Sequence, residues 1–210
     1  MNMNANMNIN MNIIVVGIII FTLIYIKNNK KLISSDKIIS GNKHLYAHHL
    51  MIIVHPTDEL IYGGKLLLSQ KNWKVICITA IRSNLCQQFI NVMNTIQCEY
   101  EIWDHEENPY SIQWNLNIIQ NNLKRVISEK CYQMIITHNF CNDINIQHKF
   151  ISKLLYQIKP LNLYFFCHDN KFINPFSSII HILINSYYPQ QKIHTKYIDH
   201  QTHLLIIPRI

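Results

Sequence analysis

The chain has 210 residues, of which 49% are hydrophobic and 15% are charged, and its formal net charge is +7 at pH 7. This length fits one folded domain with a single core. The basic balance suits an anionic membrane surface or an anionic substrate; because no basic cluster is interleaved with aromatic residues, we expect no nucleic-acid partner. The six cysteines form no Cys-x-x-Cys pair, which is typical of reduced thiols in a cytosolic domain.

The amino end is unlike the rest of the chain. Residues 1–12 are a low-complexity Met/Asn stretch, and residues 13–26 (IIVVGIIIFTLIYI) are uncharged and strongly apolar. This run is short, since about 20 residues usually span a bilayer and about 17 are the lower end. A cleaved signal peptide is the alternative, but the basic residues follow the apolar run and no small-x-small cleavage site comes after it. We therefore expect a short transmembrane anchor, a polar linker over residues 27–43 and a folded domain over residues 44–210.

The lysines after the apolar run predict the orientation of this anchor. Positive charge beside a membrane span stays on the cytoplasmic side, and a short span suits the thinner bilayer of the endoplasmic reticulum. We expect a single-pass protein of the endoplasmic reticulum membrane whose domain faces the cytosol. The residues that set this orientation are Lys27, Lys30 and Lys31.

Beyond the linker, predicted strands and helices alternate along the chain. Apolar runs predict strands, and apolar residues at helical spacing predict helices. The expected order is strand 50–54, helix 59–70, strand 73–79, helix 84–96, strand 98–103, helix 112–129, strand 132–137, helix 149–157, strand 161–167, and a final pair of strand 179–184 and helix from about 189 to 205. Such alternation is typical of an α/β fold, here a Rossmann-like, mainly parallel sheet with helices on both faces.

The first predicted strand runs directly into possible metal ligands. The strand at residues 50–54 is followed by His55, Pro56, Thr57, Asp58 and Glu59. Because proline cannot continue a strand ladder, the chain leaves the sheet here and the His and Asp side chains lie at the strand's carboxyl end. In open α/β sheets ligands bind at this edge. Histidine and aspartate supply the nitrogen and oxygen donors that Zn²⁺ uses, and a catalytic zinc needs about three of them.

A third zinc ligand is predicted in the segment that repeats this pattern. The strand at 132–137 is followed by a polar loop and then by the helix at 149–157, and His148 opens that helix. It can therefore face His55 across one crevice. Gly63 and Gly64 do not form a phosphate loop, since no Lys-Ser/Thr follows them; we expect them to allow close packing of the first helix on the sheet.

These motifs resemble those of the LmbE-like zinc de-N-acetylases, and most of all the eukaryotic branch that acts on N-acetylglucosaminylphosphatidylinositol. The family's His-Pro-Asp-Asp-Glu motif is matched at four of five positions by residues 55–59. Its His-x-x-His motif aligns with residues 145–148, where only the second His is present. The branch's closing Cys-His-x-Ser-Gln-Leu-Leu is similar to residues 199–205, and the likeness covers nearly the whole soluble part.

The resemblance implies an assignment for each site residue. His55, Asp58 and His148 would be the Zn²⁺ ligands, and Asp104 and His200 would contact substrate. The family's general base falls on Thr57, whose hydroxyl cannot take a proton from zinc-bound water at neutral pH. The family's oxyanion-supporting histidine falls on Asn145, which can donate a hydrogen bond but cannot act as an acid. Substitute bases in the same two loops are Glu59, Asp143 and His138.

The implied activity is zinc-dependent removal of the N-acetyl group from N-acetylglucosaminyl-phosphatidylinositol, a step in glycosylphosphatidylinositol-anchor biosynthesis, with a membrane glycolipid as substrate. Two alternatives stay open at this stage. One is a zinc-binding but catalytically impaired homologue that acts as a membrane-associated accessory or scaffold protein. The other is a plain core that binds no metal.

Overall fold

The computed structural model describes residues 37–42, 47–82, 84–108, 110–141, 143–190 and 196–205, and for residues 82, 168–172, 196–197 and 200–205 it gives only the backbone. The expected anchor at residues 13–26 and most of the expected linker lie outside this range. Within it, no helix combines the length and apolar character that a membrane span needs.

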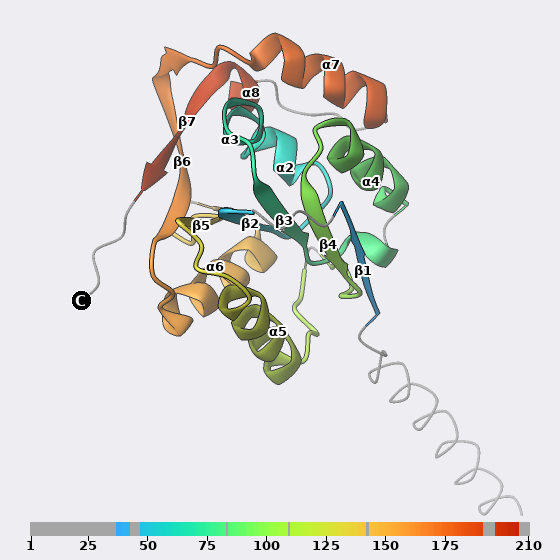
Figure 1. Cartoon of the computed structure of the whole chain (residues 1–210), viewed down its shortest axis with the longest axis vertical. Helices are drawn as coiled ribbons and strands as arrows, with labels where there is room; N and C mark the ends of the chain where they lie inside the picture. The colour runs from blue at the N-terminus through green and yellow to red at the C-terminus, as the bar shows by residue number, and fades with distance from the viewer. Residues whose placement is uncertain are drawn as a thin grey trace, which may run out of the picture. The chain divides into compact units, whose positions relative to one another are not determined.

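The described residues form a seven-stranded sheet in the order β1-β4-β3-β2-β5-β6-β7 (Figure 1). The five central strands run parallel, and the two edge strands β1 and β7 pair antiparallel with β4 and β6. The strands are β1 (Ile38–Gly41), β2 (His49–Ile53), β3 (Trp73–Cys77), β4 (Glu99–Trp103), β5 (Met134–Thr137), β6 (Leu163–Ile173) and β7 (His200–Leu205).

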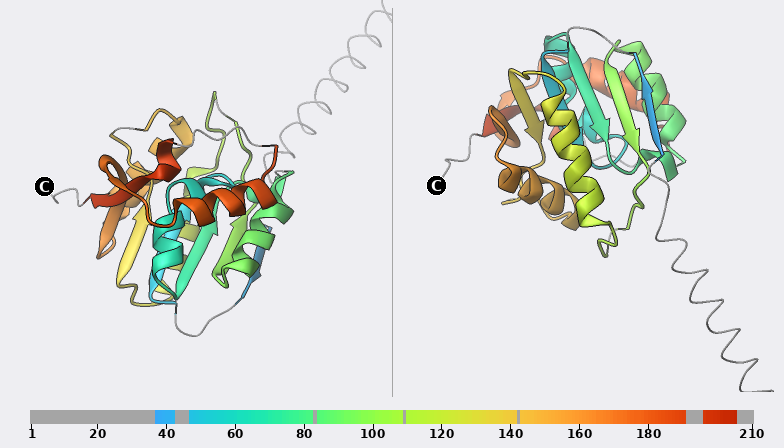
Figure 2. Two further views of the ribbon diagram at one scale, coloured as in Figure 1. Left: turned by 90° about the horizontal axis from the view of Figure 1, so that it is seen from above. Right: turned by 60° about the horizontal axis from the view of Figure 1, so that its bottom comes forward.

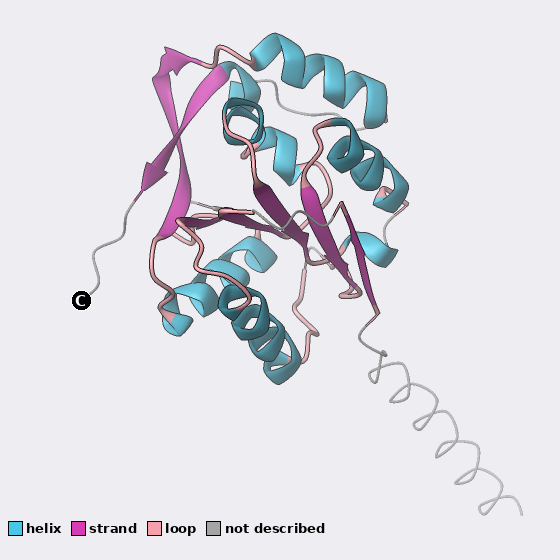
Figure 3. Ribbon diagram, in the orientation of Figure 1, coloured by secondary structure: helices cyan, strands magenta, loops and turns pink. Residues whose placement is uncertain are grey.

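Helices cover both faces of this sheet (Figures 2 and 3). The core on one face is made with α5 and α6, and the core on the other with α3, α4 and α7. The helices are α2 (Asp58–Ile61), α3 (Gly64–Ser69), the 3-10 turn η1 (Ala80–Arg82), α4 (Cys86–Thr95), α5 (Leu116–Ser128), α6 (Ile146–Ile158), α7 (Ser177–Tyr187) and α8 (Lys196–Asp199).

Strand β2 shows why an unbroken apolar run forms the centre of the sheet. Leu50 and Ile52 belong to the core under α5 and α6, whereas Met51 and Ile53 belong to the core on the opposite face. Side chains alternate between the faces of a strand, so a strand covered on both faces is apolar at every position. The α/β fold with a mostly parallel sheet and helices on both faces is thus confirmed.

Several expected elements are different in the structure. The apolar run at 179–184 is not a strand but the centre of α7, in which Ile180, Leu183 and Ile184 face the core. Isoleucine also occupies exposed positions of this helix, which hides the helical period. The expected helix over 189–205 is wrong as well, because only α8 is helical there and the rest of the described segment pairs with β6 as β7.

Two smaller differences concern the first half of the chain. The expected helix at 59–70 is divided into α2 and α3, and Ile38–Gly41, within the expected linker, is strand β1 of the sheet. The break between α2 and α3 lies at Gly63 and Gly64. A Cβ on Gly63 would collide with the Met51 side chain and one on Gly64 with Ile180, so the expected close packing is confirmed.

The strand order creates a crevice at the carboxyl edge of the sheet. From β2 the chain builds outward through β3 and β4 on one side, and later through β5 and β6 on the other. This is the strand pattern of doubly wound folds, in which the direction of winding reverses between two neighbouring central strands. Here those strands are β2 and β5, and proteins of this fold class bind ligands between the loops that follow such a pair.

Candidate metal centre

The loops after β2 and β5 carry the predicted metal ligands to this crevice. His55 follows β2, Asp58 is the first residue of α2, and His148 lies in the first turn of α6. The turn after β2 holds its own shape, because the His55 amide donates to Asp58 Oδ2 at 2.9 Å and the Asp58 amide donates to the His55 carbonyl at 3.3 Å. Asp58 and His148 are buried and His55 is nearly so.

Three ligand atoms from these residues form a nearly equilateral triangle. His55 Nδ1 lies 3.0 Å from His148 Nε2 and 3.5 Å from Asp58 Oδ2, and the distance between His148 Nε2 and Asp58 Oδ2 is 3.2 Å. Tetrahedral zinc with bonds of about 2.0–2.2 Å requires ligand atoms about 3.3–3.6 Å apart. The three residues therefore fit a zinc-sized cation with a small outward adjustment.

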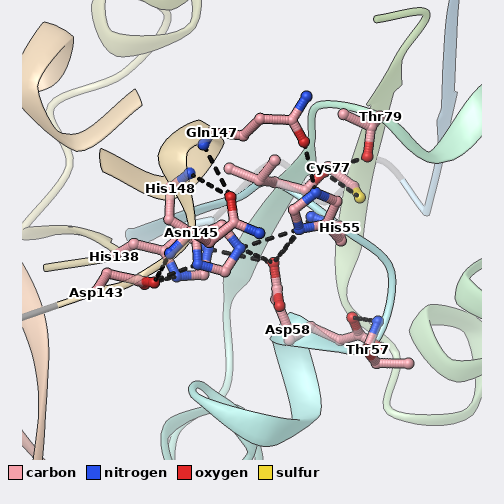
Figure 4. Close-up of polar contacts among 12 residues, drawn as sticks. His55, Thr57, Asp58, Cys77, Thr79, His138, Asp143, Asn145, Gln147 and His148 are labelled. Carbon is pink, nitrogen blue, oxygen red and sulfur yellow. Dashed lines mark hydrogen bonds and ion pairs between the residues drawn. The ribbon is translucent and has the colours of Figure 1, made fainter. Parts of the chain in front are cut away.

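The outer ring nitrogens of both histidines are engaged elsewhere (Figure 4). His148 Nδ1 lies 2.7 Å from Asp143 Oδ2, and a carboxylate can only accept, so this nitrogen carries the proton. His55 Nε2 lies 2.8 Å from Gln147 Oε1, and the Gln147 amide nitrogen donates to the Glu106 carbonyl at 3.2 Å. That second contact fixes which end of the amide faces His55, so His55 Nε2 is the donor.

In neutral histidines this arrangement leaves two lone pairs facing one another. His55 Nδ1 and His148 Nε2 would repel at 3.0 Å unless a cation or a proton lies between them. Burial lowers the pKa of His148, but the carboxylates of Asp58 and Asp143 outweigh it and raise that pKa to about 9. A proton can therefore hold the place that a metal would take. Carboxylate or amide partners on the outer nitrogen are the usual support of metal-binding histidines.

The sequence predicts His138 only as a substitute base. Its ring is fully buried and stacks on that of His148, with centroids 3.6 Å apart and planes 13° from parallel. Its Nε2 lies 3.3 Å from Asp58 Oδ2, although neither ring nitrogen makes a hydrogen bond of good geometry. Burial and the neighbouring charge of His148 lower the pKa of His138 to about 4. With Asp143 and His148 it forms a second group that could hold a metal ion.

The sequence contained a signal for this histidine. His138 directly follows strand β5, and His55 lies two residues after the neighbouring strand β2. A histidine thus stands just beyond the carboxyl end of each of these two central strands. Among the described residues, His138 does not join the compact group of His55, Asp58 and His148. As placed here it is not a fourth ligand of that group.

The residues expected to perform acid-base chemistry are engaged in the turn itself. Thr57 has φ 89°, an unusual conformation for a β-branched residue, and its amide donates to Glu59 Oε2 at 2.8 Å. Glu59 Oε1 accepts from the Tyr188 hydroxyl at 2.6 Å. Burial raises the pKa of Glu59 to about 8. Both carboxylate oxygens of Glu59 therefore serve the turn.

Asn145 is the N-cap of α6. Its side-chain oxygen accepts from the backbone amides of Gln147 at 2.8 Å and His148 at 3.3 Å. The backbone amide of Asn145 donates to Asp143 Oδ1 at 2.9 Å. This cap fixes the first turn of the helix, and with it the position of His148. The role of Asn145 toward an oxyanion stays a prediction.

The two expected substrate-binding residues lie at the same edge of the sheet. Asp104 follows β4, in the loop whose Glu106 carbonyl holds Gln147. His200 begins β7 and its backbone pairs with Ile173 at the carboxyl end of β6, but its side chain lies outside the described part of the structure. Asp104 belongs to neither of the two potential metal groups.

The six cysteines do not contribute to this site. All six are free thiols: Cys77 and Cys98 are buried, Cys86 and Cys167 are partly buried, and Cys131 and Cys141 are exposed. Reduced thiols agree with the expectation from sequence, but only part of the set lies in the core.

Fold and side chains together define a Rossmann-like α/β protein with a potential His/Asp metal centre at its topological switch point. The chain is 41% identical over 198 residues to the uncharacterized protein L374 of Acanthamoeba polyphaga mimivirus, and the match covers 84% of this chain and 88% of that protein. The chain therefore belongs to the family of this mimivirus protein. No protein-family model and no solved structure matches it.

Proposed function

We propose that this protein is a zinc-dependent hydrolase that removes the N-acetyl group of N-acetylglucosaminyl-phosphatidylinositol, at the cytosolic face of the endoplasmic reticulum membrane. The observation that supports it is the triangle of His55 Nδ1, His148 Nε2 and Asp58 Oδ2, with sides of 3.0, 3.2 and 3.5 Å, at a ligand-binding edge of the sheet. The resemblance of the surrounding motifs to LmbE-like deacetylases supplies the reaction and the substrate.

In this function the chain's own residues hold and orient the reacting groups. His55, Asp58 and His148 would bind Zn²⁺, which when present activates a water molecule and polarises the acetyl carbonyl. Asp143 and Gln147 hold the two imidazole rings in the tautomers that leave a lone pair free for the metal. Burial of Asp58 and His148 limits the access of bulk water, which strengthens the electrostatic interactions in the site.

The identity of the proton acceptor follows from which groups are already engaged. Asp143 is bound to His148, and Glu59 is bound to Tyr188 and the Thr57 amide. His138 is the substitute whose ring nitrogens lack a well-formed hydrogen bond and which lies beside Asp58. We assign it as the acceptor in the proposed reaction; its pKa of about 4 makes it a weak base, which agrees with an enzyme weakened by the loss of the family's aspartate. General acid-base assistance is worth about 100- to 10,000-fold in rate.

The first experiment measures metal and product together. The full chain, purified in detergent, should contain about one zinc per molecule by elemental analysis and release acetate from a short-chain N-acetylglucosaminyl-phosphatidylinositol. His148→Ala should lose both properties. His181→Ala is the matched control, because His181 pairs with Asp199 and belongs to neither potential metal group. Absence of stoichiometric zinc in the wild type would refute the metal centre and leave the plain-core alternative.

The second experiment separates a weakened enzyme from a scaffold. Thr57→Asp restores the carboxylate of the resembling family, and aspartate tolerates the positive φ of this position better than threonine. We expect acetate release to rise about 100-fold while the zinc content stays the same. If zinc binds and acetate is not formed even by this variant, the membrane-associated scaffold function holds instead.

A further inference from the structure

The most exposed apolar side chains gather at the sheet edge that carries the metal centre. Among the described residues, the three most exposed large hydrophobic side chains are Ile144 at 95%, Tyr110 at 92% and Ile173 at 80%. Ile144 lies in the loop after β5, Tyr110 in the loop after β4, and Ile173 at the end of β6. All three therefore extend from carboxyl ends of parallel strands.

Two more exposed apolar residues lie at the same edge. Leu116 is the first residue of α5, which begins where the loop from β4 ends, and Ile38 begins β1 opposite Trp103, the last residue of β4. Isolated exposed apolar residues are normal on protein surfaces. Five of the eight large ones in the described part of the chain share this edge, however, and such a concentration points to a binding surface.

Two contacts join the loop that carries Tyr110 to helix α6, which begins two residues after Ile144. The Glu106 carbonyl accepts from Gln147 Nε2 at 3.2 Å, and the Trp114 ring lies 5.8 Å from that of Phe150. Gln147 in turn holds the proposed ligand His55. The loop of Tyr110 and the segment that follows Ile144 thus border the candidate metal centre.

The charges at this edge are mixed. Glu106 and Glu107 are exposed in the loop after β4, and Lys37 is exposed beside the start of β1. Nothing in this balance favours a strongly anionic partner. An electrically neutral, zwitterionic surface fits it better.

The chain enters the domain at the same edge. β1 runs antiparallel to β4, so its first residue, Ile38, lies at the carboxyl end of the parallel strands. The apolar run at residues 13–26 is separated from Ile38 by residues 27–37, a stretch that can span about 40 Å at most. An amino end bound to a membrane would therefore join the domain at the edge that holds the candidate metal centre.

We propose that this edge, with Tyr110, Ile144 and Ile173 as contact residues, docks on the surface of a lipid bilayer. The headgroup of a membrane lipid then reaches the metal centre without leaving the bilayer, while the apolar side chains enter the boundary between headgroups and acyl chains. The proposal rests on the proposed function in taking a lipid as substrate, but the docking itself requires no metal chemistry.

The test maps which residues touch lipid. The full chain is reconstituted into phosphatidylcholine vesicles that contain a phosphatidylcholine with a photoactivatable group near the headgroup, and crosslinked peptides are identified by mass spectrometry. We expect crosslinks within residues 104–115 and 139–145, and none around Leu161, an exposed leucine at the opposite edge. Equal labelling of both edges, or of neither, would overturn the proposal.

Variants make the same test quantitative. Tyr110→Ser combined with Ile144→Ser should lower crosslinking of the two loops about tenfold or more, since each large apolar side chain contributes strongly to transfer from water. Leu161→Ser is the matched control and should change nothing. Zinc content and circular dichroism report whether each variant is folded. Crosslinking without acetate release leaves the docking intact and removes the deacetylase function, whereas acetate release without loop crosslinking removes the docking.

Discussion

Gln147 shows how one buried amide orients a potential metal ligand. Its oxygen accepts from His55 Nε2 and its nitrogen donates to the Glu106 carbonyl, so the amide cannot rotate without losing both hydrogen bonds. His55 is thereby held with Nδ1 unprotonated and directed at His148. The side-chain conformational entropy of His55 is therefore lost when the protein folds and not when a metal binds.

Removing that amide should weaken metal binding without unfolding the turn. We expect Gln147→Leu to lower zinc affinity about 10- to 100-fold, measured by competition with a chromophoric chelator. Gln147→Glu keeps an acceptor for His55 and should recover much of the loss. Gln87→Leu, on the exposed face of α4, is the control. Unchanged affinity in Gln147→Leu would show that the tautomer of His55 is set by the metal alone.

Asn145 and Asn115 form a matched pair that separates capping from catalysis. Both are helix N-caps whose side-chain oxygens accept from two backbone amides, but only Asn145 adjoins the metal centre. Each Asn→Ala change should cost about 1 kcal/mol of unfolding free energy in urea denaturation. Serine at position 115 or 145 keeps a side-chain oxygen that can accept from the backbone amides of the first turn, so the cap is retained. If Asn145 also donates to an oxyanion, Asn145→Ser lowers acetate release about 100- to 1,000-fold while Asn115→Ser does not; equal activities would restrict Asn145 to capping.

At the scale of elements, a buried charge network joins β3, β4 and the end of α5. Lys74 Nζ lies 2.6 Å from Glu129, 3.2 Å from Glu101 and 3.6 Å from Glu99. Glu101 also binds Arg125 and accepts from Trp103 Nε1 at 2.7 Å. The network occupies one end of the interface under α5, where the rest of the packing is apolar.

This network should make stability depend on pH in the acid range. Burial raises the pKa of Glu101, but Arg125, Trp103 and Lys74 outweigh it and lower that pKa below 4.5. Its contribution is therefore complete above about pH 4.5 and is lost as the pH falls through the lower folded-state value. Glu101→Gln should cost about 3 kcal/mol at pH 7, because it leaves the buried Lys74 less well paired. In urea denaturation, the unfolding free energy of Glu101→Gln should also vary less with pH in the acid range than that of the wild type.

The exposed Glu107 provides the control for this prediction. Glu107→Gln should leave the unfolding free energy within about 0.5 kcal/mol of wild type at every pH. A Glu101→Gln protein with the full acid dependence of the wild type would assign that dependence to other carboxylates.

At the scale of the whole molecule, the potential metal centre lies between the two halves of the sheet. His55 and Asp58 follow β2, which leads into the half formed by β3 and β4, and His148 follows β5, which leads into the half formed by β6 and β7. A cation bound by all three therefore stabilises the native state and not the unfolded chain, in which the ligands are some 90 residues apart in sequence.

Zinc should raise the thermal midpoint of the full chain. At a free zinc concentration about 100 times the dissociation constant, the gain is about 2.7 kcal/mol, or about 5–10 °C for a domain of this size. A chelator should reverse it, and His55→Ala should abolish it. His181→Ala should retain the full shift. A wild-type midpoint that does not respond to zinc would exclude a metal that bridges the two halves.

The sequence by itself determined the features that depend on neighbouring residues. The apolar runs of the central strands, the turn that brings Asp58 next to His55 and the helix that begins near His148 all follow from local pattern. Their alternation was enough to predict a parallel sheet covered on both faces. The candidate ligands were predictable because carboxyl ends of parallel strands share one edge.

Only the tertiary structure decided what depends on distant contacts. The segment 200–205 is a strand because β6 offers an open edge, and residues 179–184 are helical because one face packs against the sheet core, which the excess of isoleucine conceals in the sequence. The stacking of His138 on His148, and the hold of Gln147 on His55, likewise require segments that no local pattern joins. Local sequence sets the conformation of each segment, but the free energy of pairing and burial sets which segments meet.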